Sequence, residues 1–387
     1  MTSDFTANTA ISILCSYIKN EQLNIDLNEE QIKDLFLVMK AHDLTHLPGL
    51  TIIDANNKPK YEMFQRAQFM AAMRYEQQQY QRMKISELFE NNGIKYVHLK
   101  GSVIAQLYRE SWHRTSCDID ILLNKSDIDK AVKLLSDELG YKLRQNMTDH
   151  DISLFLGDNI HVELHYDLCE SCIDLNDAMK SAEPASGKKY EYVFTPEIIM
   201  LYHYAHMATH FKKGGIGLKS VLDLYLLEHN VKYDKEILNN LLTKGGIKKF
   251  ADAMLHITKV WFEDGKPDEL TDILKSFIFD SGAYGSLKHT VTMYMHESLE
   301  KNAGSGNFKY AINRIFLPYK DLKYIYPILL KHKSLIPVYQ IKRWITLLSP
   351  KRFGKVKKEI KTVAGMNADT SCKIIDMLKE LELLDSK

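Results

Sequence analysis

The chain has 387 residues, of which 45% are hydrophobic and 26% are charged, and its formal net charge is +1. This apolar fraction, together with few glycines and prolines, excludes an intrinsically disordered chain and a collagen-like or low-complexity polymer. At roughly 150 residues per domain, the length predicts two or three domains.

The net charge is the sum of two regions of opposite sign. Residues 301–387 carry 18 Lys and Arg against 7 Asp and Glu, a net charge of +11, whereas residues 1–300 carry 33 against 43, a net charge of −10. Most of the basic excess lies in residues 301–361, where aromatic residues alternate with lysines. This mixture is typical of a region that meets an anionic surface, such as lipid headgroups, a lipid-linked glycan or nucleic acid. Ordinary helices with solvated lysine faces would give the same pattern, so both interpretations stay open.

Neither the cysteines nor the apolar segments indicate export. The five cysteines are scattered, and the first residues lack a basic segment followed by an apolar core. Charges interrupt every apolar run before the ~18 residues that a membrane span needs. We therefore expect a cytoplasmic protein with reduced thiols and no transmembrane segment.

The first 92 residues have a helical pattern. Apolar residues recur at intervals of three and four from Ala10 onward, with one loop signal between Leu47 and Pro59. The segment 61–90 is rich in good helix formers and ends at Asn91-Asn92-Gly93, a helix C-cap signal. Residues 1–92 are therefore predicted to form an N-terminal helical region.

Residues 93–195 change to an alternation of strands and helices. A capping-box pattern at Ser126–Asp129 and a closing Gly140 mark the longer helix. The predicted strands are 94–99, 117–123, 141–144, 151–156 and 160–168, and the predicted helices are 103–109 and 128–139. This order predicts an α/β unit of about a hundred residues.

Helical periodicity returns at Thr195-Pro196, because proline after threonine is a helix start signal. Glycine-containing breaks at 212–217, 245–246 and 265–267 divide the following hundred residues into several helices. Residues 196–300 are predicted to be a helical domain, 300–308 a linker, and 301–387 a basic helical C-terminal region.

Two carboxylates, Asp118 and Asp120, lie in the predicted strand 117–123. Residues two apart on a strand share a face and lie about 7 Å apart along it. Two like charges on one face repel, so the pair is favourable with a cation beside it, and oxygen ligands favour Mg²⁺ or Mn²⁺.

The pair Gly101-Ser102 lies where a strand passes into a helix. Free N–H groups and the positive end of the helix dipole are available there to an anion, and glycine lets a phosphate approach the backbone. Lys100 would steady a phosphate or be an exposed lysine, and Arg114 would neutralise a triphosphate or pair with a neighbouring acid. A phosphate cradle beside metal-binding carboxylates is a phosphoryl-transfer layout.

A third acid, Glu163, lies in a later strand between His161 and His165. Alternation puts the three side chains on one face, so Glu163 is a candidate metal ligand or a base for the proton of an acceptor. We interpret the two histidines as lining a half-buried face in preference to binding zinc.

A second set of histidines falls on one face of a predicted helix. His203, His206 and His210 would make a zinc site conceivable, but no acid or cysteine has matching spacing, so core or acceptor-pocket histidines are favoured. Lys219 and Asp223 are spaced as an i,i+4 ion pair.

These residues resemble the signature of the DNA polymerase β-like nucleotidyltransferase superfamily. The motif Leu99-Lys100-Gly101-Ser102, the residue Arg114, the pair Asp118-Ile119-Asp120 and the later Glu163 look like its glycine-serine and Asp-x-Asp pattern. The Leu-Lys-Gly opening and the downstream segments 206–210 and 214–223 are similar to the group called uncharacterised nucleotidyltransferases. The likeness covers roughly residues 40–300 and, more weakly, Tyr324 to Trp344.

The resemblance implies an α+β fold with a nucleotidyltransferase-type mixed β-sheet core flanked by N-terminal and C-terminal helical regions. It implies transfer of a nucleoside monophosphate from a nucleoside triphosphate to an unidentified acceptor hydroxyl or phosphate, with pyrophosphate leaving. It assigns catalysis and binding of Mg²⁺ (or Mn²⁺) to Asp118, Asp120 and Glu163. It assigns nucleotide binding to Lys100, Gly101, Ser102 and Arg114.

The acceptor is expected between the core and the helices after Pro196. Two alternatives to this enzyme are a catalytically inactive nucleotide- or partner-binding module on the same fold and a zinc-dependent hydrolase that uses the histidines.

Overall fold

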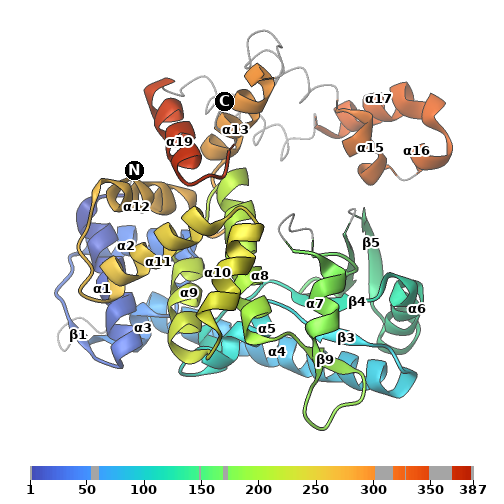
Figure 1. Ribbon diagram of the computed structural model, residues 1–387, viewed down its shortest axis with the longest axis horizontal. Coiled ribbons are helices and arrows are strands. Elements are labelled where there is room, and N and C mark those ends of the chain that lie inside the picture. The colour runs from blue at the N-terminus through green and yellow to red at the C-terminus, as the bar shows by residue number, and fades with distance from the viewer. Residues whose placement is uncertain are drawn as a thin grey trace.

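The computed structural model describes residues 2–53, 61–147, 150–168, 173–300, 317–326, 328–347 and 368–384. A seven-stranded mixed sheet lies between helices that precede and follow it in the chain (Figure 1). The predicted α+β class, with helical regions flanking a mixed sheet, is therefore confirmed.

The N-terminal region is mainly helical, as predicted. Its longest helix has 31 residues and ends at Gly93, whose φ of 68° is the left-handed conformation that a glycine cap accommodates. The bounds are α1 Asp4–Lys19, β1 Leu23–Asn24, α2 Glu29–Ala41, α3 Pro48–Thr51, β2 Ile52–Ile53 and α4 Glu62–Asn92. The strands β1 and β2 pair in parallel as a separate two-stranded sheet.

The central sheet has the strand order β5-β6-β7-β4-β3-β9-β8. The β4–β7 and β3–β9 pairs are parallel, and the other four pairs are antiparallel. The strands are β3 Tyr96–His98, β4 Ile119–Leu123, β5 Lys142–Met147, β6 Asp151–Leu156, β7 Ile160–His165, β8 Glu183–Pro184 and β9 Glu191–Val193, and the helices between them are α5 Gly101–Ile104, α6 Ile128–Leu139 and α7 Leu175–Ser181.

The two faces of the central sheet have different surroundings. Alternate residues of β4 and β7, such as Ile121 and Val162, are fully buried in one apolar cluster with Phe89 of α4 and Leu135 of α6. Because side chains alternate along a strand, the residues between them project from the opposite face. That opposite face carries the polar residues Asp120 and Glu163, so α4 and α6 cover the back of the candidate site.

A second apolar cluster packs the N-terminal helices against the helices that follow the sheet. It contains residues of α1 and α2 together with residues of the helices that follow the sheet, and the Cys15 Sγ lies 3.0 Å from the carbonyl oxygen of Trp261. These helices are α8 Pro196–Lys213, α9 Leu218–Asn230, α10 Lys235–Lys244, α11 Lys248–Phe262, α12 Glu269–Ser281 and α13 Leu287–Glu300. Three of their breaks coincide with the predicted glycine-containing segments, whereas the breaks at 231–234 and 282–286 were not predicted. The predicted domain boundaries stay predictions.

The segment after Gly101 differs from the predicted helix 103–109. The helix α5 ends at Ile104, a short 3₁₀ helix covers Ala105–Leu107, and Tyr108 is extended with ψ 157°. The break lets the buried Tyr108 hydroxyl donate a hydrogen bond of 2.7 Å to Asp223 on α9. The helical periodicity could not show this, because the contact joins residues more than a hundred positions apart.

The predicted capping box before α6 is wrong. Residues Lys125–Asp127 form a 3₁₀ helix, and Asp127 has helical φ and ψ of −95° and −9°, so its side chain makes no cap. The closing residue is predicted correctly, since Gly140 has φ 73°. The short elements α7, β8 and β9 were not predicted.

The C-terminal region is described in part. Its helices are α15 Tyr319–Ile325, α16 Ile328–Lys331, α17 Ile336–Leu347 and α19 Ala368–Glu380, with a 3₁₀ helix at Lys333–Leu335. Leu378 of α19 is fully buried in the second apolar cluster. The predicted linker, apart from residue 300, and much of the basic segment 301–361 lie outside the described residues. Within the described parts of the chain, no helix is both long and apolar enough to cross a bilayer.

Candidate active site

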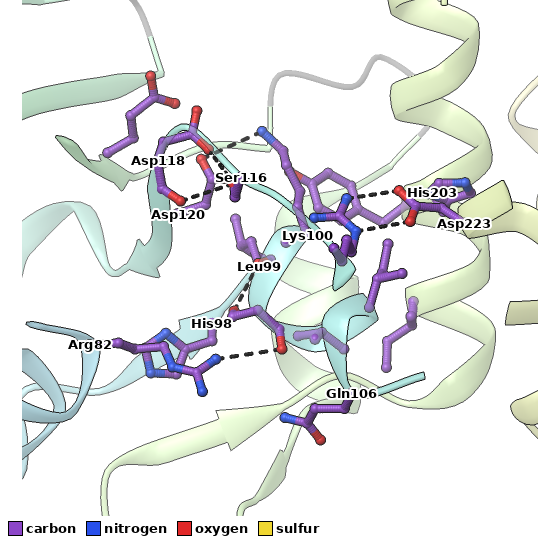
Figure 2. Close-up of a pocket in the computed structure, with 18 of the residues that line it drawn as sticks. Arg82, His98, Leu99, Lys100, Gln106, Ser116, Asp118, Asp120, His203 and Asp223 are labelled. Atoms are coloured by element: carbon purple, nitrogen blue, oxygen red, sulfur yellow. Dashed lines mark hydrogen bonds and ion pairs between the residues drawn. The ribbon is translucent and has the colours of Figure 1, made fainter. Parts of the chain in front are cut away.

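The three predicted acids meet on the open face of the sheet, at the neighbouring strands β4 and β7. Because these strands are parallel and in register, Asp120 lies directly beside Glu163. Asp118 is two residues earlier, at the start of β4, and Figure 2 shows it close to Asp120. The sequence predicted each acid separately, and the strand pairing brings them together.

Asp120 is buried between two basic side chains. Its Oδ1 lies 3.8 Å from the Lys100 Nζ and 3.0 Å from the His165 Nε2. Burial alone would raise the pKa of Asp120, but the Lys100 ammonium and the His165 ring outweigh it and hold that pKa well below its usual range. Asp120 is therefore a carboxylate at neutral pH.

Asp118 has the opposite electrostatic surroundings. Burial and the neighbouring carboxylates of Asp120 and Glu163 raise the pKa of Asp118 to about 6, although the Ser116 hydroxyl donates a hydrogen bond of 3.0 Å to its Oδ1. Repulsion between carboxylates is the condition that a bound cation relieves. The donor chemistry therefore fits the Mg²⁺ or Mn²⁺ that the sequence predicted.

His165 is a direct partner of Asp120, a role that the sequence did not predict for it. Burial would lower its pKa, but hydrogen bonds to Asp120 and Glu163 outweigh it and raise the pKa to about 9. His165 is buried, whereas His161 is partly exposed, so the predicted half-buried face describes His161 only.

The Gly101-Ser102 turn lies beside the acids at the start of α5. Lys100 has φ 42°, an unusual backbone conformation for a residue with a side chain, and it turns the chain from β3 into α5. The Ser102 hydroxyl donates to the Leu99 carbonyl oxygen at 3.2 Å. The first N–H groups of α5 have no acceptor within the helix, as at any helix start.

Arg114 has a different partner from the predicted nucleotide. Its Nε and Nη2 donate to the two carboxylate oxygens of Asp223 at 2.9 and 2.8 Å, and both side chains are less than 10% exposed. Of the two interpretations left open for Arg114, the structure shows the ion pair (Figure 2). Nucleotide binding by Arg114 stays a prediction.

The predicted pair of Lys219 with Asp223 is wrong. The Lys219 Nζ lies 2.6 Å from Asp43 Oδ2, which also accepts a hydrogen bond of 2.8 Å from the Thr115 hydroxyl. Asp43 was missed from the sequence, because no local pattern marks a partner 176 positions away. The ion pair with Asp43 holds the start of α9 near the segment that leads into β4.

Histidines of α8 line the same cavity as the acids. Burial lowers the pKa of His203, His206 and His210, so all three favour the neutral form. Within the described residues, these three histidines of α8 belong to neither of the two side-chain groups able to share a metal ion.

The side chains able to share an ion form two overlapping groups. One contains Asp118, His161 and Glu163, and the other contains Asp120, Glu163 and His165, with the ligand atoms of each group within 4.8 Å of one another. These spacings suit a single divalent ion in each group. The predicted ligands Asp118, Asp120 and Glu163 are therefore all present, divided between two positions.

A single cavity of about 1090 Å³ connects these groups. It is lined by the Lys100–Ser102 turn, the acids, and residues of α4, α8 and α9. This volume exceeds the roughly 300–1,000 Å³ typical of a pocket for one small ligand, so it has room for two.

Comparison with protein families gives a match to this chain. Residues 28–263 match the model of a protein family described as uncharacterised nucleotidyltransferase, and this span is more than half of the chain. No curated protein matches the sequence. The matched span contains the Gly-Ser turn, both aspartates and Glu163, and it confirms the resemblance with somewhat different bounds. The chain belongs to the uncharacterised nucleotidyltransferase family.

Proposed function

We propose that this protein transfers a nucleoside monophosphate from a nucleoside triphosphate to a hydroxyl or phosphate of an unidentified acceptor. The observation that carries the proposal is the parallel pairing of β4 with β7, which puts Glu163 beside Asp120. Both acids line the same cavity as the Gly-Ser turn. Family membership supports the same reaction class.

The acids would hold the metal. Asp118, Asp120 and Glu163 are the oxygen donors that Mg²⁺ or Mn²⁺ prefers. When bound, such ions neutralise phosphate charge and stabilise the attacking and leaving oxygens of an in-line displacement. Lys100 keeps Asp120 ionised for this role before any metal binds.

The turn at Lys100–Ser102 would hold the triphosphate. The N–H groups of Gly101 and Ser102 begin α5, where a helix start offers donors to a phosphate. Burial would lower the pKa of Lys100, but the nearby Asp120 outweighs it and raises the pKa above its ordinary value, so this ammonium stays positive beside the phosphates.

The acceptor would enter from the α8 side of the cavity. An acceptor oxygen attacks the α-phosphorus, the bond from that phosphorus to the bridging oxygen breaks, and pyrophosphate leaves with the electron pair.

Of the two carboxylates in its group, Glu163 is the more exposed, at 22%, against 5% for Asp120. Glu163 therefore suits the base that takes the proton of an acceptor hydroxyl.

Incubation with each α-labelled nucleoside triphosphate, a divalent metal and a cell extract tests the reaction. We expect label on an acceptor with the wild-type protein and a loss of about a hundredfold or more in Asp120→Asn, because a metal ligand is removed. The exposed Asp129→Asn on α6 is the matched control. Full label transfer by Asp120→Asn would contradict the assignment, and nucleotide binding without any product would favour the inactive binding module.

We also propose that the C-terminal helices hold the protein against an anionic surface. Several apolar side chains there are exposed, with Ile325 at 44%, Leu330 at 61% and Val338 at 58%. The exposed lysines Lys331 and Lys333 lie among them. Exposed apolar residues interleaved with lysines are the composition of helices that lie in the headgroup region of an anionic membrane.

A further inference from the structure

Strand β7 places two imidazoles on either side of Glu163. His161, Glu163 and His165 are alternate residues, so their side chains leave the same face. The His161 Nε2 lies 3.6 Å from one carboxylate oxygen of Glu163, and the His165 Nε2 lies 3.5 Å from the other. Each oxygen of Glu163 therefore faces a different histidine.

The paired strand β4 supplies one aspartate to each imidazole. Asp120 lies 3.0 Å from His165, and Asp118 belongs to the group that contains His161. Ligands held about 2.1 Å from one octahedral ion are about 3 Å apart when adjacent and about 4.2 Å apart when opposite. The ligand atoms of each group all lie within 4.8 Å of one another, close to this range, so small side-chain movements complete either position.

Neighbouring side chains limit the movement of the two imidazoles. The His161 ring stacks on Phe155, with centroids 4.3 Å apart and planes 9° apart, and its Nε2 lies 3.1 Å from the Ser153 hydroxyl. The His165 side chain is only 4% exposed. Side chains held in this way suit ligands, because little freedom is lost when a metal binds.

Ligand chemistry then decides the preferred ion. Mg²⁺ takes oxygen ligands and keeps several waters, whereas imidazole nitrogen adds affinity for the transition metals. Mn²⁺ accepts carboxylates and adopts the octahedral geometry of phosphoryl-transfer sites, and it also follows Mg²⁺ in size and charge. A mixed set of two carboxylates and one imidazole therefore favours Mn²⁺ over Mg²⁺.

We infer that these side chains hold two Mn²⁺ ions that share Glu163. His161 would complete one position, and His165 would complete the other once its Nε2 proton has been released to solvent. The inference rests on the proposed function for the premise that these acids bind metal. It adds two nitrogen ligands and a preference for Mn²⁺ over Mg²⁺, and it makes Glu163 a shared metal ligand in place of the proposed base.

Calorimetric titration of metal-free full-length protein with Mn²⁺ and, separately, with Mg²⁺ tests the preference. We expect two Mn²⁺ ions to bind at least about tenfold more tightly than Mg²⁺. His161→Asn and His165→Asn should each weaken Mn²⁺ binding at one position by about 10–100-fold and leave Mg²⁺ affinity unchanged. The exposed His332→Asn is the matched control.

Pulsed electron paramagnetic resonance of bound Mn²⁺ gives a readout that does not depend on activity. Nitrogen-14 couplings from directly bound imidazole are expected in the wild type, and they should weaken in either histidine variant. His161 is the more exposed of the two, so His161→Asn keeps the test valid if His165→Asn fails to fold.

Equal Mn²⁺ and Mg²⁺ affinities without nitrogen coupling would overturn the inference and leave the histidines as hydrogen-bond partners of the acids. The two proposals fail separately. Label transfer with Mg²⁺ and no nitrogen coupling removes only the metal assignment, whereas nitrogen coupling without label transfer to any acceptor removes only the proposed reaction.

Discussion

Gly101 has no room for a side chain. A Cβ at this position would lie 2.9 Å from the Arg114 Nη1 and 3.1 Å from the Ser116 hydroxyl oxygen. The guanidinium cannot easily move, because Asp223 holds it through two hydrogen bonds. Packing of Arg114 and Ser116 beneath the turn therefore requires glycine at this position.

Gly101→Ala is therefore expected to displace the turn. We expect destabilisation of about 1–3 kcal/mol, the usual cost of overpacking a buried position, together with weaker triphosphate binding. Urea unfolding and calorimetric titration with a nucleoside triphosphate measure the two effects. In the control Gly49→Ala the closest atom is the amide end of Gln68, which can swing away. Equal effects of the two substitutions would contradict the packing argument.

Local sequence determined some of the site residues but not their partners. Strand alternation predicted that Asp118 and Asp120 share a face, and the strand-to-helix change located Gly101. The partner of Arg114 could not be predicted, because Asp223 lies 109 positions away and no periodicity connects the two residues.

At the scale of elements, the Arg114–Asp223 ion pair fastens α9 to the segment that leads into β4. The Tyr108 hydroxyl donates to the same carboxylate at 2.7 Å. Burial would raise the pKa of Asp223, but Arg114 outweighs it and lowers the pKa below its ordinary value. This buried contact forms one wall of the cavity and fixes the helical region against the sheet.

Asp223→Asn should be strongly destabilising. It leaves the buried Arg114 charge without its partner, and breaking a buried pair in this way typically costs about 3–5 kcal/mol. Asp252→Asn provides the comparison, because Asp252 pairs with Lys248 on the exposed surface of α11 and such pairs contribute about 0–1 kcal/mol. The two free energies of unfolding in urea are compared. A similar decrease in the free energy of unfolding in both variants would contradict a stabilising role for the Arg114–Asp223 pair.

At the scale of the whole molecule, buried neutral histidines occur in several elements. Burial lowers the pKa of His42 to about 4, of His98 to about 3, and of His113 and His289 to about 4. In the unfolded chain each would titrate near 6.5. As the pH falls below that value the unfolded state binds protons that the folded state does not, so stability falls.

As the pH falls from 6.5 to 5, each of these histidines should remove stability at a rate that rises toward about 1.4 kcal/mol per pH unit. Carboxylates with lowered pKa values contribute only at more acidic pH. The raised pKa of Asp118, about 6, acts in the opposite direction in this window but offsets no more than one histidine, so the histidines dominate. His289→Gln should make the dependence shallower, and the exposed His332→Gln should not change it. The free energy of unfolding measured across this range checks the prediction, and a flat profile in the wild type would contradict it.

The C-terminal helices provide a test of the anionic surface. Removing everything after residue 300 would also remove α19, whose Leu378 is buried in the core, so charge reversal is the cleaner change. Each lysine near an anionic bilayer contributes about 1 kcal/mol, so Lys331→Glu, Lys333→Glu and Lys342→Glu together should weaken binding to phosphatidylglycerol vesicles by roughly a hundredfold.

Vesicle sedimentation measures this binding, with neutral phosphatidylcholine vesicles as the reference. The matched control reverses three exposed lysines outside the region, Lys235, Lys244 and Lys266. An equal loss in the control, or no binding by the wild type, would leave the C-terminal lysines as ordinary solvated side chains.

The sequence by itself determined that helical regions flank an α/β unit, several helix limits and the chemical types of the site residues. Helix limits follow from local backbone preferences, as at Gly93, Gly140 and Pro196. Facing carboxylates follow from the two-residue period of a strand. These properties depend on neighbours within a few positions, so the order of residues along the chain is sufficient to predict them.

Only the tertiary structure decided which distant groups meet. The pairing of β4 with β7 put Glu163 beside Asp120, and it gave Asp120 the His165 ring as a partner. The Lys219–Asp43 ion pair arose in the same way from helices far apart in the chain. Strand register and helix packing depend on which apolar faces of whole elements bury one another. The periodicity of one element shows that it has an apolar face but does not show which other element covers that face.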